Sequence, residues 1–91
     1  MKSIIILGST GSIGTNTLDI VQRFPHEFRV VGLTAGNNID RLEEQIRRFR
    51  PKAVAVSTES SAALLRARCA TLPVEILSGE EGIASVASGL D

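Results

Sequence analysis

The sequence predicts an α/β protein built on a parallel sheet of about four strands, with helices packed on both faces of the sheet. Short apolar stretches alternate along the chain with longer stretches in which apolar residues recur at helical spacing. The segments between them are short and rich in glycine, proline and asparagine, which are typical of turns. The 91 residues are enough for one hydrophobic core but not for two.

The first strand, a glycine-rich loop and the first helix come at the start of the chain. Residues 3–7 are apolar and largely β-branched, which suits a strand that is covered on both faces. Three glycines follow, each three residues after the last. The helix after them should begin near Ser12 and end before Pro25, because proline disfavours helical backbone in the residue that precedes it.

The rest of the chain continues the alternation. Further strands are predicted over residues 28–33, 53–56 and 74–77, with a final helix over residues 79–87. Asn38 should cap the second helix, and Thr58 or Glu59 should open the third.

The expected strand order is third, second, first, fourth, as in the first half of a doubly wound nucleotide domain. Such a domain commonly has about six strands, and this chain has room for only about four. Residues 1–91 are therefore predicted to form a truncated N-terminal, Rossmann-like domain of a longer protein.

Composition and charge argue against several classes of function. Ten basic and ten acidic residues cancel, whereas proteins that bind nucleic acid or anionic membranes through charge are usually basic. No apolar run approaches the ~20 residues of a membrane span, and no signal peptide is recognisable. The single cysteine, Cys69, cannot form a disulfide within the chain, which favours a cytoplasmic protein. Cys69 is expected to be a buried apolar residue. No set of residues predicts a catalytic centre or a metal site.

The glycine-rich loop, Gly8–Gly14 (GSTGSIG), predicts a binding site for a dinucleotide. Its spacing differs from the usual G-x-G-x-x-G, but it lies between a buried strand and an amphipathic helix, as that motif requires. Gly11 should let the backbone approach a pyrophosphate, and the amides of Gly11, Ser12 and Ile13 should point outward at the helix N-terminus. The hydroxyls of Thr10 and Ser12 can add donors. A plain turn would need one glycine, and no lysine follows the loop as in an ATP-hydrolysing P-loop.

The end of the second strand favours NADP over NAD. NAD-binding domains usually place an acidic residue there, about 20 residues after the loop, to hold the ribose hydroxyls. Here the positions are Gly36, Asn37 and Asn38, which offer only neutral donors at a second helix N-terminus. We expect these three residues to bind the 2′-phosphate, with Arg41 as a further candidate contact.

These residues carry a resemblance to a known family. Nearly the whole chain resembles the 1-deoxy-D-xylulose 5-phosphate reductoisomerase family. The stretches that carry the resemblance are the glycine-rich loop, TLDIV at 17–21, FRVV at 28–31, PKAVAV at 51–56 and LSG at 77–79. The resemblance implies an oxidoreductase of non-mevalonate isoprenoid biosynthesis. Such an enzyme rearranges 1-deoxy-D-xylulose 5-phosphate and reduces it with NADPH to 2-C-methyl-D-erythritol 4-phosphate. It implies a divalent cation (manganese, magnesium or cobalt) and a homodimer in the full-length enzyme.

By the same resemblance, Thr10, Gly11, Ser12 and Ile13 would hold the pyrophosphate, and residues 36–38 would hold the 2′-phosphate. Position 37 is often basic in that family, so the neutral Asn37 would weaken the preference for NADP. The family's metal ligands and substrate site lie in a later domain, so these 91 residues alone are expected to be inactive.

Two alternatives stay open on the sequence alone. One is another NADP enzyme with a similar loop, such as a semialdehyde dehydrogenase or an epimerase. The other is a non-catalytic module that senses the redox state of NADP and signals through a partner.

Overall fold

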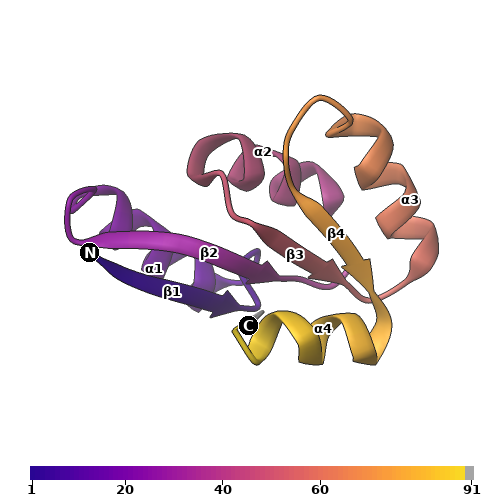
Figure 1. The fold of residues 1–91 in the computed structure, drawn as a ribbon, viewed down its shortest axis with the longest axis horizontal. Coiled ribbons are helices and arrows are strands. Elements are labelled where there is room, and N and C mark those ends of the chain that lie inside the picture. Colours follow the sequence, from indigo (N-terminus) through magenta and orange to yellow (C-terminus); the bar gives the residue numbers. More distant parts are fainter. Residues whose placement is uncertain (90–91) are drawn as a thin grey trace.

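The computed structural model describes residues 1–89 and contains four strands alternating with four helices (Figure 1). The strands are β1 (Lys2–Leu7), β2 (Phe28–Thr34), β3 (Ala53–Val56) and β4 (Glu75–Ser78). The helices are α1 (Ser12–Gln22), α2 (Ile39–Phe49), α3 (Glu59–Arg68) and α4 (Gly79–Ala87). The predicted alternation is confirmed, and the fourth strand is displaced by one residue from its expected range.

Local interactions explain where two of the helices begin. The Asn38 side chain accepts a hydrogen bond from the amide of Arg41 at 3.2 Å, and the Thr58 hydroxyl accepts one from the amide of Ser61 at 3.2 Å. Both are N-cap contacts, which satisfy amides that have no partner inside the helix. The predicted cap at Asn38 is therefore confirmed, and of the two residues expected to open the third helix, Thr58 is the cap and Glu59 the first helical residue.

The strands form one parallel sheet in the order β1-β2-β3-β4. The expected order was wrong, because β4 lies beside β3 instead of beside β1. In this sheet Ala53–Val56 pairs residue by residue with Glu75–Ser78. The Arg66 side chain on α3 also donates to the carbonyl of Ile76 at 2.7 Å, which fastens α3 to β4. The short crossover through α3 thus joins neighbouring strands, and no crossover back to β1 occurs among residues 1–89.

This order decides which face each helix covers. All three crossovers step along the sheet in one direction, so right-handed connections put α1, α2 and α3 on the same face. Their apolar side chains form the larger core with the sheet, including Leu18, Leu42 and Leu65. The last helix, α4, returns across the opposite face, where Val86 packs on Ala53 and Ala55 (Figure 1). Helices on both faces, as predicted, are confirmed.

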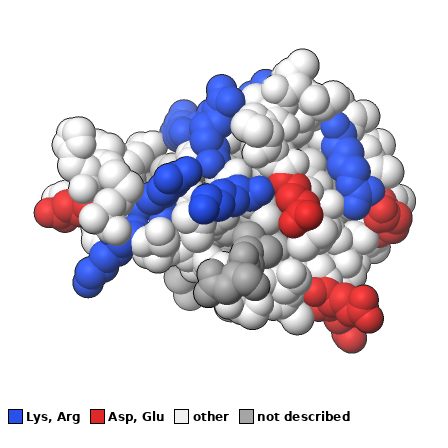
Figure 2. All heavy atoms as spheres, in the orientation of Figure 1, with Lys and Arg blue, Asp and Glu red and all other residues white. Residues whose placement is uncertain are grey.

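The surface carries charges of both signs. On the face drawn in Figure 2, basic and acidic side chains are interspersed. At the end of α2, Arg47 pairs with Glu43 at 3.0 Å and Arg48 donates to Gln22 at 3.3 Å. These contacts are typical of a solvated helix end.

Three further features bear on thiol chemistry, membrane insertion and metal binding. Cys69 is buried, as predicted, and this burial, together with the nearby Glu43 carboxylate, raises the pKa of its thiol. None of the helices in residues 1–89 is both long and apolar enough to cross a membrane. The same residues contain no group of three or more metal-ligating side chains.

Candidate functional site

The site lies at the carboxyl edge of the sheet, where the loops after parallel strands meet. The glycine-rich loop leaves β1, and residues 35–38 leave β2, its neighbour in the sheet. The two loops are joined directly. The amide of Ser9 donates to the Thr34 carbonyl at 2.8 Å, and the amide of Gly8 donates to the Thr34 hydroxyl at 3.1 Å. Open α/β sheets bind their ligands in this position.

The glycine-rich loop makes a tight turn onto α1. Gly8 has φ +71°, a left-handed conformation that glycine adopts at little cost. The amide of Gly11 then donates to the Gly8 carbonyl at 3.1 Å and closes the turn. Our prediction that the Gly11 amide faces outward was therefore wrong, because this amide is used inside the loop.

The three glycines have different surroundings. A Cβ at Gly14 would lie 2.2 Å from the Gly8 carbonyl oxygen and 2.7 Å from Cα of Ser9, so α1 can pack against the loop only with glycine there. A Cβ at Gly11 would have one neighbour, the Gly8 oxygen at 3.5 Å. Gly14 is thus required by packing, whereas Gly11 faces open space that a ligand can enter.

The start of α1 presents free donors. Within residues 1–89, the amides of Thr10, Ser12 and Ile13 donate no hydrogen bond, and no side chain caps the helix at Gly11. The Ile13 side chain, 83% exposed, borders these amides. Free amides at a helix N-terminus attract anions, because the helix dipole adds to their partial charges.

The second loop also offers donors. Gly36, Asn37 and Asn38 are all exposed. The Asn38 side-chain oxygen caps α2, and the Asn37 side-chain oxygen accepts from the Ser61 hydroxyl at 2.8 Å and lies 3.3 Å from the Thr58 hydroxyl. Because protein donors occupy both oxygens, the two NH₂ groups are left to face a ligand.

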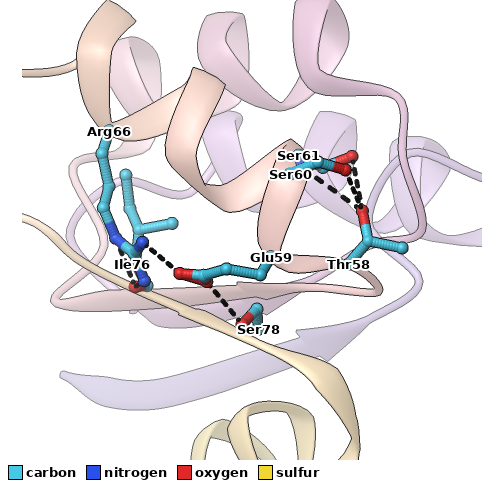
Figure 3. Close-up of polar contacts among 7 residues, drawn as sticks. All are labelled: Thr58, Glu59, Ser60, Ser61, Arg66, Ile76 and Ser78. Carbon is cyan, nitrogen blue, oxygen red and sulfur yellow. Dashed lines mark hydrogen bonds and ion pairs between the residues drawn. The ribbon is translucent and has the colours of Figure 1, made fainter.

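The hydroxyls of Thr58, Ser60 and Ser61 form a cluster at the start of α3 (Figure 3). The sequence pattern did not predict this cluster, because the contact between Ser61 and Asn37 spans 24 residues. Arg41 lines a groove between α1 and α2. Asp40, the acid next to the loop, is ion-paired with Arg68 and so leaves the loop without a free carboxylate.

A buried residue of α2 was also missed. The Gln45 side chain is 7% exposed, and its amide nitrogen donates to the Ser9 carbonyl in the glycine-rich loop at 2.8 Å. A signal existed in the sequence, since position 45 falls on the buried face of α2 with Leu42 and Ile46. A polar residue on an apolar helix face indicates a specific partner.

Comparison with known proteins points to one family. A family-wide sequence model described as 1-deoxy-D-xylulose 5-phosphate reductoisomerase matches residues 4–91. Reductoisomerases of that name from Anaeromyxobacter sp. (strain K) and Chloroherpeton thalassium are 56% and 50% identical over 91 residues. These matches cover all of this chain but only 23% and 24% of the two relatives.

Solved structures give the same result. A crystal structure of DOX-P reductoisomerase in complex with NADPH, fosmidomycin and magnesium superposes with a TM-score of 0.92 at 36% identity, covering 98% of this chain and 22% of that one. The Zymomonas mobilis reductoisomerase in complex with NADPH superposes with a TM-score of 0.89 at 30% identity, covering 94% and 23%. The chain thus spans about a quarter of the length of the proteins it matches.

Proposed function

The chain belongs to the 1-deoxy-D-xylulose 5-phosphate reductoisomerase family, and we propose that residues 1–91 are the NADPH-binding N-terminal domain of such an enzyme. The observation that carries this proposal is a pair of donor-lined loops, joined through Thr34, at the carboxyl edge of a parallel sheet. One loop suits a pyrophosphate, and the other suits a further phosphate nearby.

The residues fit the cofactor as follows. The free amides of Thr10, Ser12 and Ile13, with the Thr10 hydroxyl, would bind the pyrophosphate across the open space at Gly11. Asn37 and Asn38 would donate to the 2′-phosphate beside Gly36. NADPH supplies a hydride when bound, and the chain's own contribution is to hold and orient it.

The reaction belongs to the full-length protein. There we propose the conversion of 1-deoxy-D-xylulose 5-phosphate to 2-C-methyl-D-erythritol 4-phosphate, a step of isoprenoid biosynthesis. We place the divalent cation and the substrate site outside residues 1–91, so this chain alone should be inactive. We expect the full-length enzyme to be a cytoplasmic homodimer; its mass in solution, from sedimentation, tests the dimer. Because the chain belongs to this family, we set aside the alternative that it is part of a semialdehyde dehydrogenase or an epimerase.

The direct test is a titration of the chain with NADPH and with NADH, followed by amide shifts in NMR spectra and by calorimetry. We expect the signals of Thr10, Ser12 and Ile13 to move with both nucleotides, and those of Asn37 and Asn38 to move only with NADPH. NADPH should bind about tenfold more tightly, which corresponds to one hydrogen bond to a charged phosphate. Equal affinity for the two nucleotides would contradict the 2′-phosphate site, and binding of neither would contradict the proposed function.

The variant Asn37→Asp sharpens this test. A carboxylate at position 37 would repel the 2′-phosphate and could accept from the ribose hydroxyls of NADH. We expect the preference for NADPH to disappear while the unfolding temperature stays unchanged, because Asn37 is exposed. Asn16→Asp, an exposed change on α1, is the control and should leave the preference intact. A preference that survives in Asn37→Asp would place the 2′-phosphate elsewhere.

A further inference from the structure

Gln45 is an unusual residue for its position in the core. It lies on the buried face of α2 between Leu42 and Ile46, which are 0% and 1% exposed. A methionine would fill a similar volume without removing a polar amide from water, so the glutamine costs free energy that a contact must offset. Its side-chain oxygen and the Ser9 hydroxyl are buried without a partner among residues 1–89. This polar cluster is therefore poorly suited to stabilising the fold, which favours a functional role.

Gln45 contacts Ser9 at the start of the glycine-rich loop, which we call the stem of the loop. Its amide nitrogen donates to the Ser9 carbonyl at 2.8 Å, across 36 residues of sequence. Ser9 is itself fully buried, and its amide donates to the Thr34 carbonyl on β2. The stem is thus held by β2 through its amide and by α2 through its carbonyl.

This second attachment sets the direction of a free donor. The peptide between Ser9 and Thr10 is planar and trans, so its carbonyl and its N–H point in opposite directions. Because Gln45 draws the Ser9 carbonyl toward α2, the Thr10 N–H points away from α2. Without that hydrogen bond the peptide could rotate and turn a carbonyl oxygen toward the anion site.

From this geometry we propose that Gln45 is a positioning residue for the cofactor phosphates, and the proposal rests on the proposed function. It acts through the Ser9–Thr10 peptide and does not touch the cofactor. Asn38, in the 2′-phosphate loop, caps the same helix. One rigid helix therefore holds both loops, the first through Gln45 and the second at its N-terminus.

The test compares Gln45→Met with Leu42→Met in the same chain. Both changes put methionine on the buried face of α2, but only the first removes the donor. We expect Gln45→Met to change the unfolding temperature little, because the Ser9 carbonyl loses its donor while the unpaired oxygen of Gln45 is removed. Binding of NADPH and of NADH should weaken by the same factor of about ten. The equal loss follows because the pyrophosphate loop is common to both nucleotides. Leu42→Met should leave both affinities within about twofold.

The NMR signal of the Thr10 amide, measured without nucleotide, tests the role of Gln45 independently of the proposed function. In the unliganded chain, Gln45→Met should shift the Thr10 amide signal and Leu42→Met should not. If the wild-type chain binds neither nucleotide, the proposed function fails. The Thr10 signal still tests whether Gln45 fixes the orientation of the Ser9–Thr10 peptide. An unmoved Thr10 signal, or an affinity that falls only as much as in Leu42→Met, overturns the role of Gln45.

Discussion

Gly11 and Gly14 lie one helical turn apart, yet a side chain would have different consequences at the two positions. At Gly14 it would meet backbone atoms of Gly8 and Ser9 that cannot move without displacing β1 or α1. At Gly11 it would meet only the Gly8 oxygen at an ordinary contact distance. Gly11 thus leaves space that a ligand can enter, whereas Gly14 lets α1 pack against the backbone of Gly8 and Ser9.

This difference predicts a clear contrast between two alanine variants. Gly11→Ala should unfold at nearly the wild-type temperature but bind NADPH at least about tenfold more weakly, because its methyl group occupies the approach to the pyrophosphate. Gly14→Ala should lose about 3 kcal/mol of unfolding free energy, because it overpacks a contact between backbones. Thermal unfolding and calorimetry on both variants measure the two effects. A stable Gly14→Ala, or unchanged binding in Gly11→Ala, would contradict the assignment.

Among the elements, α3 is fastened to β4 by a small polar network (Figure 3). The Glu59 carboxylate accepts from Arg66 at 2.6 Å and from the Ser78 hydroxyl at 2.9 Å. Arg66 also donates twice to the Ile76 carbonyl, at 2.7 and 3.2 Å. These contacts join both the first and the last turn of α3 to β4, and they hold β4 at the β3 side of the sheet.

The network predicts a pH dependence of stability. Hydrogen bonds from Arg66 and then from Ser78 lower the pKa of Glu59 below its ordinary value of 4.5. The contribution of Glu59 is therefore present above pH 4.5 and is lost as the pH falls through the lower, folded-state pKa. We expect the unfolding temperature of wild type to fall more between pH 5 and 3 than that of Glu59→Gln. Glu81→Gln, in the first turn of α4, is the control; parallel curves for wild type and Glu59→Gln would refute the effect.

Over the whole molecule, the two faces of the sheet are covered unequally. Three helices pack on one face, while α4 alone covers the other in the described part of the chain. Small residues let α4 approach closely. A Cβ at Gly32 would lie 2.9 Å from Cγ1 of Val86, and one at Gly82 would lie 2.8 Å from Cβ of Leu77. Val86 is 0% exposed at the centre of this contact.

The close fit predicts that Gly32 and Val86 are energetically coupled. Val86→Ala should cost about 2 kcal/mol, because it removes two buried methyl groups and leaves a cavity. Gly32→Ala should cost about 1–3 kcal/mol by crowding Val86. In the double variant the new methyl group enters the space that Val86 vacates, so the combined cost should be smaller than the sum. Denaturant unfolding of the four proteins measures this coupling, and strictly additive costs would disprove it.

Patterns along the chain were enough to predict the helices, the strands and the outline of the site. Strands and helices follow from hydrophobic spacing, Asn38 and Thr58 cap helices through contacts three residues away, and the glycines mark the loop. Each of these depends on neighbours along the chain, so each can be inferred without the fold. The membership of Thr10, Ser12 and Ile13 in a donor-lined loop was predictable for the same reason, although their contact with a cofactor stays a prediction.

The strand order, the hydrogen bond of the Gly11 amide and the contacts of Gln45 and Ser61 depend on the three-dimensional fold. A short strand such as β4 can pair with either edge of a sheet, and the choice depends on contacts such as Arg66 with Ile76. Gln45 and Ser61 find their partners 36 and 24 residues away. The spacing of residues along the chain indicates which of them face a core, but it does not indicate which distant polar group a buried side chain will contact.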